Sequence, residues 1–199
     1  MKKVVYTQRV EVIESYHERR DCADQRIALF IRTCGYLPIP VPNVSSIACK
    51  IVEELEPAGI ILVGGNSLVK YGGNAPERDE TDAAMIQLSV EKRIPLYGFC
   101  RGMQSILDYF GNKLVKVKGH VAVRHEIKGI EGTAIVNSYH NEACLELRND
   151  TLIALMRTED GVFEKVRHST LPIIGTMWHP ERESPFTEVD IKMIKELVG

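Results

Sequence analysis

The sequence predicts an α/β fold of three layers, in which helices cover both faces of a doubly wound, mostly parallel sheet with an antiparallel extension. Two observations predict this fold class. Over residues 3–110, short β-branched runs alternate with amphipathic stretches, as in parallel strands that are linked by helices. After Gly111 the pattern becomes strand-like alternation without helical periodicity, which predicts antiparallel strands.

The first half of the chain alternates predicted strands with predicted helices. The strands are short apolar runs bounded by glycine, proline or charged residues, at 3–7, 37–41, 59–63 and 94–99. The helices have apolar residues at helical spacing, at 21–33, 45–55, 76–92 and 101–110. Ile27, Phe30 and Ile31 show this spacing in the first helix, which is expected to end at Gly35.

The second half is predicted to be mostly antiparallel. Residues 113–136 and 152–166 alternate in polarity, as strands and hairpins do. A continuous apolar run at 171–177 predicts a buried strand, and an amphipathic stretch at 187–198 predicts the last helix.

Length and composition are those of one compact enzyme domain, expected to span residues 1–199. At 44% hydrophobic residues, a chain of 199 residues can bury roughly 70% of its unfolded surface in one core. The net charge of -2 gives no global attraction for nucleic acid or a membrane surface. No apolar run reaches the ~18 residues of a membrane-spanning helix. Five scattered cysteines form no disulfide framework or metal pattern, which favours the reducing cytoplasm, and the first residues predict a strand rather than a signal peptide.

Cys100 is the predicted nucleophile. It lies in Gly98-Phe99-Cys100-Arg101-Gly102, which has the spacing of a nucleophile elbow with cysteine in place of serine. The elbow needs small residues two positions before and after the nucleophile because the chain folds back sharply from strand to helix. Free N–H groups at the start of the helix stabilise the thiolate, which is the reactive form. Taken alone, the pattern also fits a buried cysteine between two turn glycines.

A base and a group to orient it are predicted near the C-terminus. The strand at 171–177 delivers Trp178-His179-Pro180-Glu181 at its end, so His179 is the candidate base and Glu181 the candidate orienting carboxylate. A lone His-Pro-Glu is more often a surface turn, but its combination with the elbow favours a catalytic triad. The remaining histidines show no ligand spacing, so we expect neither a metal nor an organic cofactor.

With these motifs, the chain resembles the class I glutamine amidotransferases that have a Cys-His-Glu triad, and within them the γ-glutamyl hydrolase branch (peptidase C26). The likeness covers most of the chain, and it implies the flavodoxin-like fold of that family. Its anchors are Asp24-Gln25-Arg26, Leu62-Val63-Gly64-Gly65-Asn66-Ser67, Gly98-Phe99-Cys100-Arg101-Gly102-Met103-Gln104, Val136-Asn137-Ser138-Tyr139-His140 and Trp178-His179-Pro180-Glu181. The turn at 64–67 lacks the Pro-Gly continuation usual in the biosynthetic amidotransferases, which favours the hydrolase branch.

The resemblance also implies roles for residues around the triad. The backbone N–H groups of Gly65 and Arg101 would form the oxyanion hole, although Gly64-Gly65 is alternatively a plain turn. The glutamyl moiety would be held by Gln104, Asn66, Ser138 and Tyr139. His140 either lines the site or packs under it.

A basic run bears on the leaving group. Seven residues that can carry positive charge stand against the single acid Glu126: Lys113, Lys116, Lys118, His120, Arg124, His125 and Lys128. Such a run is usually a solvated ribbon face. The alternative is an anion site in which Lys116, Lys118, His120 and Arg124 contact the leaving group, with Arg19 and Arg20 added to it or serving as ordinary helix-start charges.

A finer resemblance supports an anionic leaving group. The chain is similar to the γ-glutamyl-CDP-amidate hydrolases of capsule phosphoramidate synthesis in Thr7-Gln8-Arg9, Ser15-Tyr16-His17-Glu18 and Trp178-His179-Pro180-Glu181-Arg182-Glu183. The predicted function is therefore cysteine-dependent hydrolysis of the γ-glutamyl amide bond of a small metabolite, with release of glutamate and an anionic, nucleotide-linked leaving group.

Three other functions stay open. A γ-glutamyl-polyamine or γ-glutamyl-GABA hydrolase is the main competitor, and a cationic leaving group would suit Glu77, Asp79 and Glu80. A glutaminase subunit would pass ammonia to a synthase, whereas a noncatalytic redox sensor would need the thiolate but not His179 and Glu181. The expected partner is a small γ-glutamyl molecule. An obligate synthase partner is not expected, and a homodimer stays open.

Overall fold

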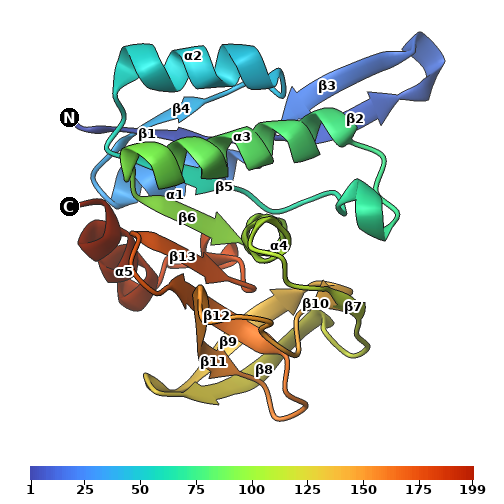
Figure 1. Cartoon of the computed structure of the whole chain (residues 1–199), viewed down its shortest axis with the longest axis vertical. Coiled ribbons are helices and arrows are strands. Elements are labelled where there is room, and N and C mark those ends of the chain that lie inside the picture. Colours follow the sequence, from blue (N-terminus) through green and yellow to red (C-terminus); the bar gives the residue numbers. More distant parts are fainter.

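Nine strands form one mixed sheet in the computed structural model, which describes residues 1–199 (Figure 1). Five neighbouring strands run parallel, in the order β4 (Leu37–Pro40), β1 (Lys3–Tyr6), β5 (Gly59–Leu62), β6 (Leu96–Phe99) and β13 (Ile173–Thr176). Four antiparallel strands extend the sheet beyond β13, in the order β12 (Phe163–His168), β11 (Leu152–Arg157), β8 (Val121–Gly129) and β9 (Gly132–Tyr139). The predicted fold class is confirmed.

Helices cover both faces of the parallel strands because these strands are apolar on both sides. On one face, α2 (Ser45–Leu55), α3 (Pro76–Lys92) and α4 (Arg101–Tyr109) form a core of 20 buried residues with Val5, Ile60 and Leu62. On the other face, α1 (Gln25–Thr33) and α5 (Glu188–Val198) pack on the alternate strand residues, among them Val4 and Ile61. None of the helices is long and apolar enough to cross a membrane.

The antiparallel strands enclose a smaller core of Ile127, Val136, Leu155, Met156 and Trp178. Beside it, β7 (Val115–Lys116) and β10 (Glu142–Ala143) form a short antiparallel pair. The remaining helical segments are single 3-10 turns at Glu14–Tyr16, Val69–Tyr71 and Pro180–Arg182.

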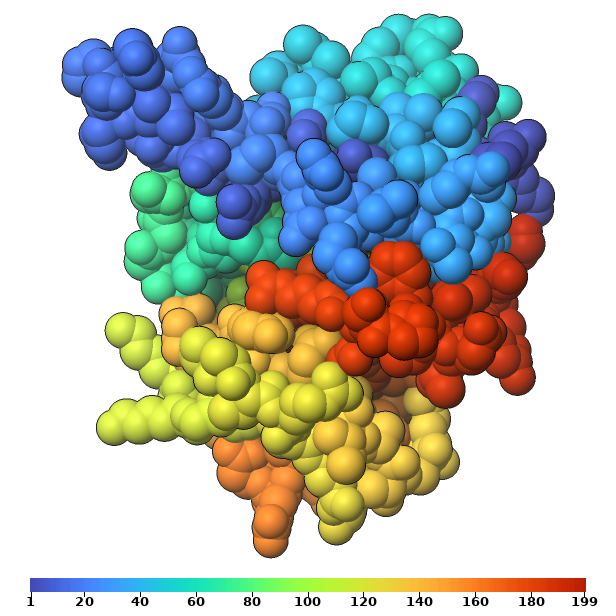
Figure 2. Space-filling view, turned by 180° about the vertical axis from the view of Figure 1, so that it is seen from behind, coloured from blue at the N-terminus to red at the C-terminus, as the bar shows by residue number.

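A hairpin of β2 (Arg9–Ile13) and β3 (Glu18–Cys22) projects from the body of the protein (Figure 2). The prediction of a helix over 21–33 is wrong at its start, since Asp21 and Cys22 belong to β3. Helix α1 begins at Gln25 because the Asp24 carboxylate accepts a hydrogen bond from the Arg26 N–H and caps the first turn. Arg19 and Arg20 are therefore hairpin residues and not helix-start charges.

Candidate active site

Three loops that carry predicted site residues meet at one edge of the sheet. Strands β5, β6 and β13 are parallel neighbours, and they end just before Gly64, Cys100 and His179, respectively. The carboxyl ends of parallel strands in open α/β sheets are where ligands bind. The fold therefore gathers the motifs that the sequence separates by up to 115 residues, from 64 to 179.

Cys100 lies in a sharp turn between β6 and α4. Its backbone has φ 50° and ψ -109°, a combination that residues other than glycine rarely adopt. Its N–H donates to the Thr176 carbonyl at 2.8 Å, and its carbonyl accepts the first helical hydrogen bond, from the Gln104 N–H. Strain of this kind is typical of functional turns and is the geometry expected of a nucleophile elbow.

The two glycines of the elbow have no room for a side chain. A Cβ atom on Gly98 would lie 2.6 Å from the Gly102 backbone, and one on Gly102 would lie 2.1 Å from the Leu62 carbonyl oxygen. Both obstacles are backbone atoms, which cannot move aside without shifting a strand or a helix. The close contact of α4 with β5 and β6 therefore requires glycine at both positions.

Replacing Gly102 by alanine is expected to destabilise the fold by about 1–3 kcal/mol or more, because the new methyl group overlaps the Leu62 carbonyl. Urea denaturation measures this change. Gln87→Ala on the exposed surface of α3 is the control, with an expected change within about 0.5 kcal/mol. A Gly102→Ala protein as stable as the control would show that α4 is not held against β5 as described.

His179 and Glu181 form a buried hydrogen-bonded pair. The Nδ1 of His179 lies 2.7 Å from Oε1 of Glu181, and both side chains are about 95% buried. Because an ionised carboxylate only accepts hydrogen bonds, Nδ1 carries the proton and Nε2 is left for the other side of the ring. His179 and Cys100 line the same cavity. The arrangement matches that of a base held by an orienting carboxylate.

The surroundings of His179 favour its charged form. Burial by itself lowers the pKa of the imidazole, but the neighbouring Cys100 sulfur and the hydrogen bond to Glu181 outweigh burial and raise the pKa to about 9. The positive charge is thus held between a potential thiolate and a carboxylate. A histidine in this state can donate a proton at neutral pH.

Asn137 fixes the backbone of His179, a role that the sequence did not reveal. Its Oδ1 accepts from the His179 N–H at 2.9 Å, and its Nδ2 donates to the His179 carbonyl at 2.9 Å. The ring of Phe99 packs edge-on against the imidazole at 5.5 Å. These contacts hold the histidine from β9 and β6 at once. Only the position of Asn137 within the motif at 136–140 hinted at a function.

The Gly64-Gly65 turn is braced by Arg78, a second residue whose role the sequence did not reveal. The fully buried guanidinium of Arg78 donates to the carbonyl groups of Val63, Gly64 and Gly65. In a trans peptide the C=O and the next N–H point in opposite directions. Because the Gly64 carbonyl is turned to Arg78, the N–H of Gly65 points away from it, and Gly65 lines the cavity beside Cys100.

Arg101 contributes through two different groups. Its backbone N–H follows Cys100 at the start of α4, where the helix dipole favours negative charge. Its buried side chain points elsewhere and forms ion pairs with Asp79 and Asp82 of α3. The side chain therefore anchors α4 to α3 and leaves only the backbone for the cavity.

Four of the five predicted glutamyl-binding residues line a cavity of about 170 Å³ next to Cys100: Asn66, Gln104, Tyr139 and His140. The amide nitrogen of Gln104 donates to the Glu142 carbonyl at 2.8 Å, which leaves its oxygen as an acceptor. Arg182 stacks over the Tyr139 ring at 4.1 Å and closes one side. The cavity is thus small, polar and next to the cysteine.

Ser138 and Asn66 use their side chains for the protein itself. Ser138 does not line the cavity, because its buried hydroxyl donates to the His120 carbonyl at 2.7 Å. The side chain of Asn66 exchanges two hydrogen bonds with the Val10 backbone and holds the β2–β3 hairpin. His140 lines the cavity, and it also contacts buried Glu164 at 3.2 Å behind it.

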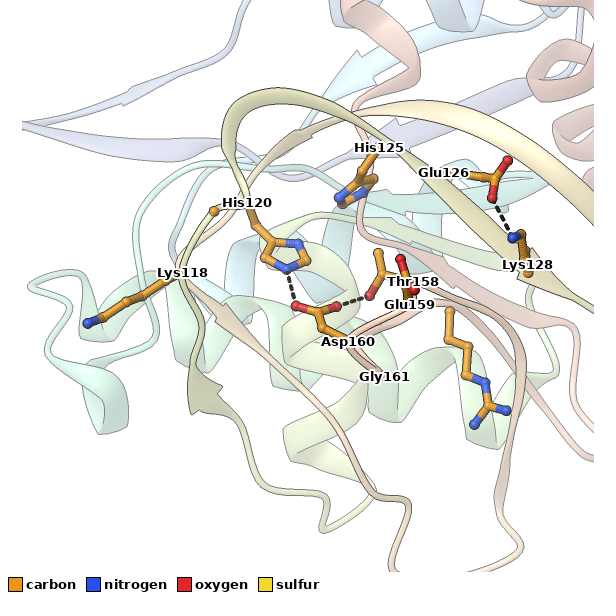
Figure 3. A pocket seen from close by; sticks show the side chains of 11 residues that line it. Lys118, His120, His125, Glu126, Lys128, Thr158, Glu159, Asp160 and Gly161 are labelled. Carbon is orange, nitrogen blue, oxygen red and sulfur yellow. Dashed lines mark hydrogen bonds and ion pairs between the residues drawn. The ribbon is translucent and has the colours of Figure 1, made fainter.

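The predicted leaving-group residues lie away from this cavity. Arg124 pairs with Glu183 at 2.7 Å, and exposed Lys116 lies on β7. Lys118 and His120 line a different cavity of about 880 Å³ beside β8 and β11 (Figure 3). The basic run is thus divided among three places, and none of its four candidates lines the cavity at Cys100.

A second cavity of about 190 Å³ adjoins the first at His179. The two cavities share Gly65, His179 and Arg182, and the second is also lined by Arg9 of β2 and by Asp24. Two arginines therefore line the second cavity, and one of them, Arg182, also lines the first. Both arginines belong to the motifs of the finer resemblance, but the sequence did not reveal a role for them.

Cys100 and the His179–Glu181 pair therefore lie at the carboxyl edge of the parallel strands of a three-layer α/β sheet. The chain belongs to the class-I glutamine amidotransferase family, whose family model matches residues 20–196. The sequence is similar to a γ-glutamyl-CDP-amidate hydrolase of Campylobacter jejuni, with 35% identity over 93% of this chain and 92% of that protein.

More distant relatives have other activities in their names. A γ-glutamyl-γ-aminobutyrate hydrolase of Escherichia coli O157:H7 is 29% identical over 75% of this chain and 74% of that protein. An anthranilate synthase component 2 of Thermococcus kodakarensis is 31% identical over 79% of this chain and 83% of that protein. Among solved structures, a glutamine amidotransferase of Thermotoga maritima has a TM-score of 0.70, at 15% identity over 98% of this chain and 83% of that chain, which supports the fold.

Proposed function

We propose that the protein hydrolyses the γ-glutamyl amide bond of a small metabolite and that Cys100, His179 and Glu181 are its catalytic triad. The observation that carries the proposal is that His179, held by its buried hydrogen bond to Glu181, lines one cavity together with the strained turn at Cys100. The similarity to γ-glutamyl hydrolases of two kinds supports this choice of bond. The oxyanion hole is assigned to the N–H groups of Gly65 and Arg101.

The first half of the reaction forms a thioester. The Cys100 thiolate attacks the γ-carbonyl carbon, and the oxygen becomes an oxyanion that accepts hydrogen bonds from the two backbone N–H groups. The C–N bond then breaks. The His179 imidazolium gives its Nε2 proton to the departing nitrogen and becomes neutral, while Glu181 keeps the ring oriented.

The second half releases glutamate. Neutral His179 takes a proton from water, whose oxygen attacks the thioester carbon. The C–S bond breaks, glutamate leaves, and the thiolate–imidazolium pair is restored. This chemistry needs only the groups named, and the small polar cavity with Gln104 and Tyr139 is the place assigned to the glutamyl part.

We assign an anionic leaving group to the second cavity. Arg9 and Arg182 line this cavity together with His179, and arginine is suited to phosphate and carboxylate. Two of the three acids considered for a cationic leaving group are paired within the protein, since Glu77 pairs with Arg19 and Asp79 pairs with Arg101, whereas Glu80 is exposed. The relative from C. jejuni, named for a CDP-amidate substrate, supports the same choice.

A panel of γ-glutamyl compounds tests the proposed function. Purified protein should release glutamate fastest from a nucleotide-linked γ-glutamyl amidate, and more slowly from γ-glutamyl-γ-aminobutyrate, a γ-glutamyl polyamine or glutamine. A preference for the polyamine or the γ-aminobutyrate conjugate would move the assignment to the competing hydrolases. Turnover of glutamine alone, stimulated by an added synthase, would favour a glutaminase subunit.

Neutralising the two arginines tests the leaving-group assignment. Arg9→Gln combined with Arg182→Gln should lower kcat/KM for the nucleotide-linked substrate by about tenfold or more, because each contact to a charged group contributes about 1.5–3 kcal/mol when desolvated. Hydrolysis of a small neutral γ-glutamyl anilide should fall much less. Lys116→Gln combined with Lys118→Gln is the matched control and should leave the ratio of the two substrates unchanged. An unchanged ratio in the arginine variant, or a change in the lysine variant, would contradict the assignment.

A further inference from the structure

Three histidines and a glutamate gather in the antiparallel part of the sheet, away from the triad. His120 precedes β8, His125 lies on β8, His140 follows β9, and Glu164 lies on β12. His120, His140 and Glu164 are at least 96% buried. Their sequence positions span 45 residues, from 120 to 164, without a metal-binding motif, so only the fold brings them together.

The orientation of His120 leaves a lone pair facing a negative charge. Its Nε2 lies 2.9 Å from the carboxylate of Asp160, and the dashed line in Figure 3 marks this contact. An ionised carboxylate only accepts hydrogen bonds, so Nε2 is the donor. When Nε2 carries the only ring proton, Nδ1 is an acceptor, yet it faces Oε1 of Glu164 at 3.9 Å. Two acceptors face each other in a buried place, and this contact is unfavourable unless a positive charge lies between them.

Other polar atoms of the cluster also lack partners. Oε2 of Glu164 and Nδ1 of His120 are buried without a hydrogen bond. Nε2 of His140 lies 3.2 Å from Oε1 of Glu164. Buried polar groups are nearly always paired, so a cluster with several unpaired atoms indicates that a binding partner satisfies them. A cation bound to Nδ1 of His120 would satisfy that atom.

The distances within the cluster are compatible with a bound metal ion. Zinc bonds of about 2.0–2.1 Å in a tetrahedron place neighbouring ligand atoms about 3.3–3.4 Å apart. The ligand atoms of His120, His140 and Glu164 all lie within 4.8 Å of one another, and those of His140 and Glu164 are 3.2 Å apart. Two imidazoles and a carboxylate form a donor set that suits zinc.

We propose that His120, His140 and Glu164 bind one zinc ion, with Asp160 as the carboxylate that orients His120. This hydrogen bond to the outer nitrogen is the usual support of a metal-binding histidine. The fourth position lies towards His125, whose Nε2 is 3.4 Å from Glu164 and which lines the 880 Å³ cavity. Either this imidazole or a water from the cavity completes the site.

The proposed ion would stabilise the wall of the candidate active site. It would join the segments before β8, after β9 and within β12, and His140 also lines the cavity at Cys100. The inference does not depend on the proposed γ-glutamyl chemistry. Its tests are metal content and thermal stability, which can be measured on a protein without activity.

Zinc binding to the untagged, chelator-treated full chain tests the proposal. Titration with ZnCl₂ alone should show one tight equivalent per chain, and Zn²⁺ at about 100 times Kd should raise Tm by about 5–10 °C. Cys100→Ala should bind equally well, because the site does not use the thiol. Glu164→Gln, which preserves size, should weaken binding more than tenfold, whereas exposed His17→Asn should not change it.

Asp160→Asn is the second variant, and it is safe for folding because that side chain is 57% exposed. It should weaken zinc binding by about 10–100-fold through His120. No Tm rise in the wild-type protein, or binding that Glu164→Gln and Asp160→Asn leave intact, would overturn the proposal. Loss of binding in Cys100→Ala would place the ion on the thiolate instead and would equally overturn it.

Discussion

Replacing Cys100 by alanine is expected to lower kcat for γ-glutamyl hydrolysis by about 10⁴-fold or more, since the variant has no nucleophile to form the thioester. The fold should persist, because the substitution removes one sulfur atom from a buried side chain, 6% exposed, and adds no atom that could clash. Cys100→Ser should retain little activity, because the hydroxyl is far less acidic than the thiol. Glutamate release under saturating substrate measures both effects.

The other cysteines provide the matched control. Cys22 lines the second cavity beside His179, and Cys34 is buried in the core between α1 and α5. Burial raises the pKa of the Cys34 thiol to about 12, so it is not a source of thiolate at neutral pH. Cys34→Ala should therefore affect stability at most, and the same is expected of Cys144→Ala, whose side chain is buried in the other core. A Cys100→Ala enzyme that keeps more than a few percent of the wild-type kcat would exclude Cys100 as the nucleophile.

The second large effect separates His179 from Glu181. His179→Asn removes the proton shuttle and should reduce kcat nearly as severely as loss of Cys100. Glu181→Gln leaves an imidazole that still transfers protons but is less well oriented. The reduction in kcat should therefore be about 10–100 times smaller than in His179→Asn. Steady-state kinetics on one substrate give the comparison. Small and equal losses at both positions would mean that the base lies elsewhere.

The same pair predicts the pH profile. Because the pKa of His179 is raised to about 9, the imidazolium persists through neutral pH, and kcat/KM should fall only as the pH rises through about 9. Glu181→Gln removes a carboxylate that raises this pKa, so the alkaline limb should move to lower pH by about one unit or more. A limb at the same pH in the variant would contradict the assigned acid.

The raised pKa of His179 also predicts that the stability of the fold decreases as the pH rises. A histidine whose pKa is higher in the folded than in the unfolded state stabilises the fold below its ordinary pKa of 6.5. This contribution decreases above pH 6.5 and is lost as the pH rises through about 9. Tm measured across this range should fall less in His179→Asn than in the wild-type protein.

The parallel half of the fold was predictable because its strands and helices bury regular faces. Helices α2 and α3 have the predicted bounds, 45–55 and 76–92. The β2–β3 hairpin was missed because most of its residues are exposed and β3 has no apolar alternation. Its contacts come from elsewhere in the chain, such as the Asn66 side chain on the Val10 backbone.

The candidate site also has residues that could be predicted from the sequence and residues that could not. Cys100, His179 and the Gly64-Gly65 turn were predictable because each follows a strand whose end can be recognised. Arg78 was not predictable, since a helix residue that hydrogen-bonds backbone carbonyls leaves no pattern in the sequence. The histidine cluster was not predictable for a similar reason. Its members come from separate antiparallel segments, and a run that reads as basic is divided by the pairing of β8 and β9.

Covalent labelling of the wild-type protein tests the central claim most directly. A γ-glutamyl electrophile, such as a glutamine analogue with a diazoketone in place of the amide, should be attacked by the reacting thiolate. Peptide mass spectrometry of the labelled protein should find one adduct, on Cys100, and excess glutamate should slow its formation. Labelling that leaves Cys100 unmodified, or that modifies Cys22 equally, would contradict the account.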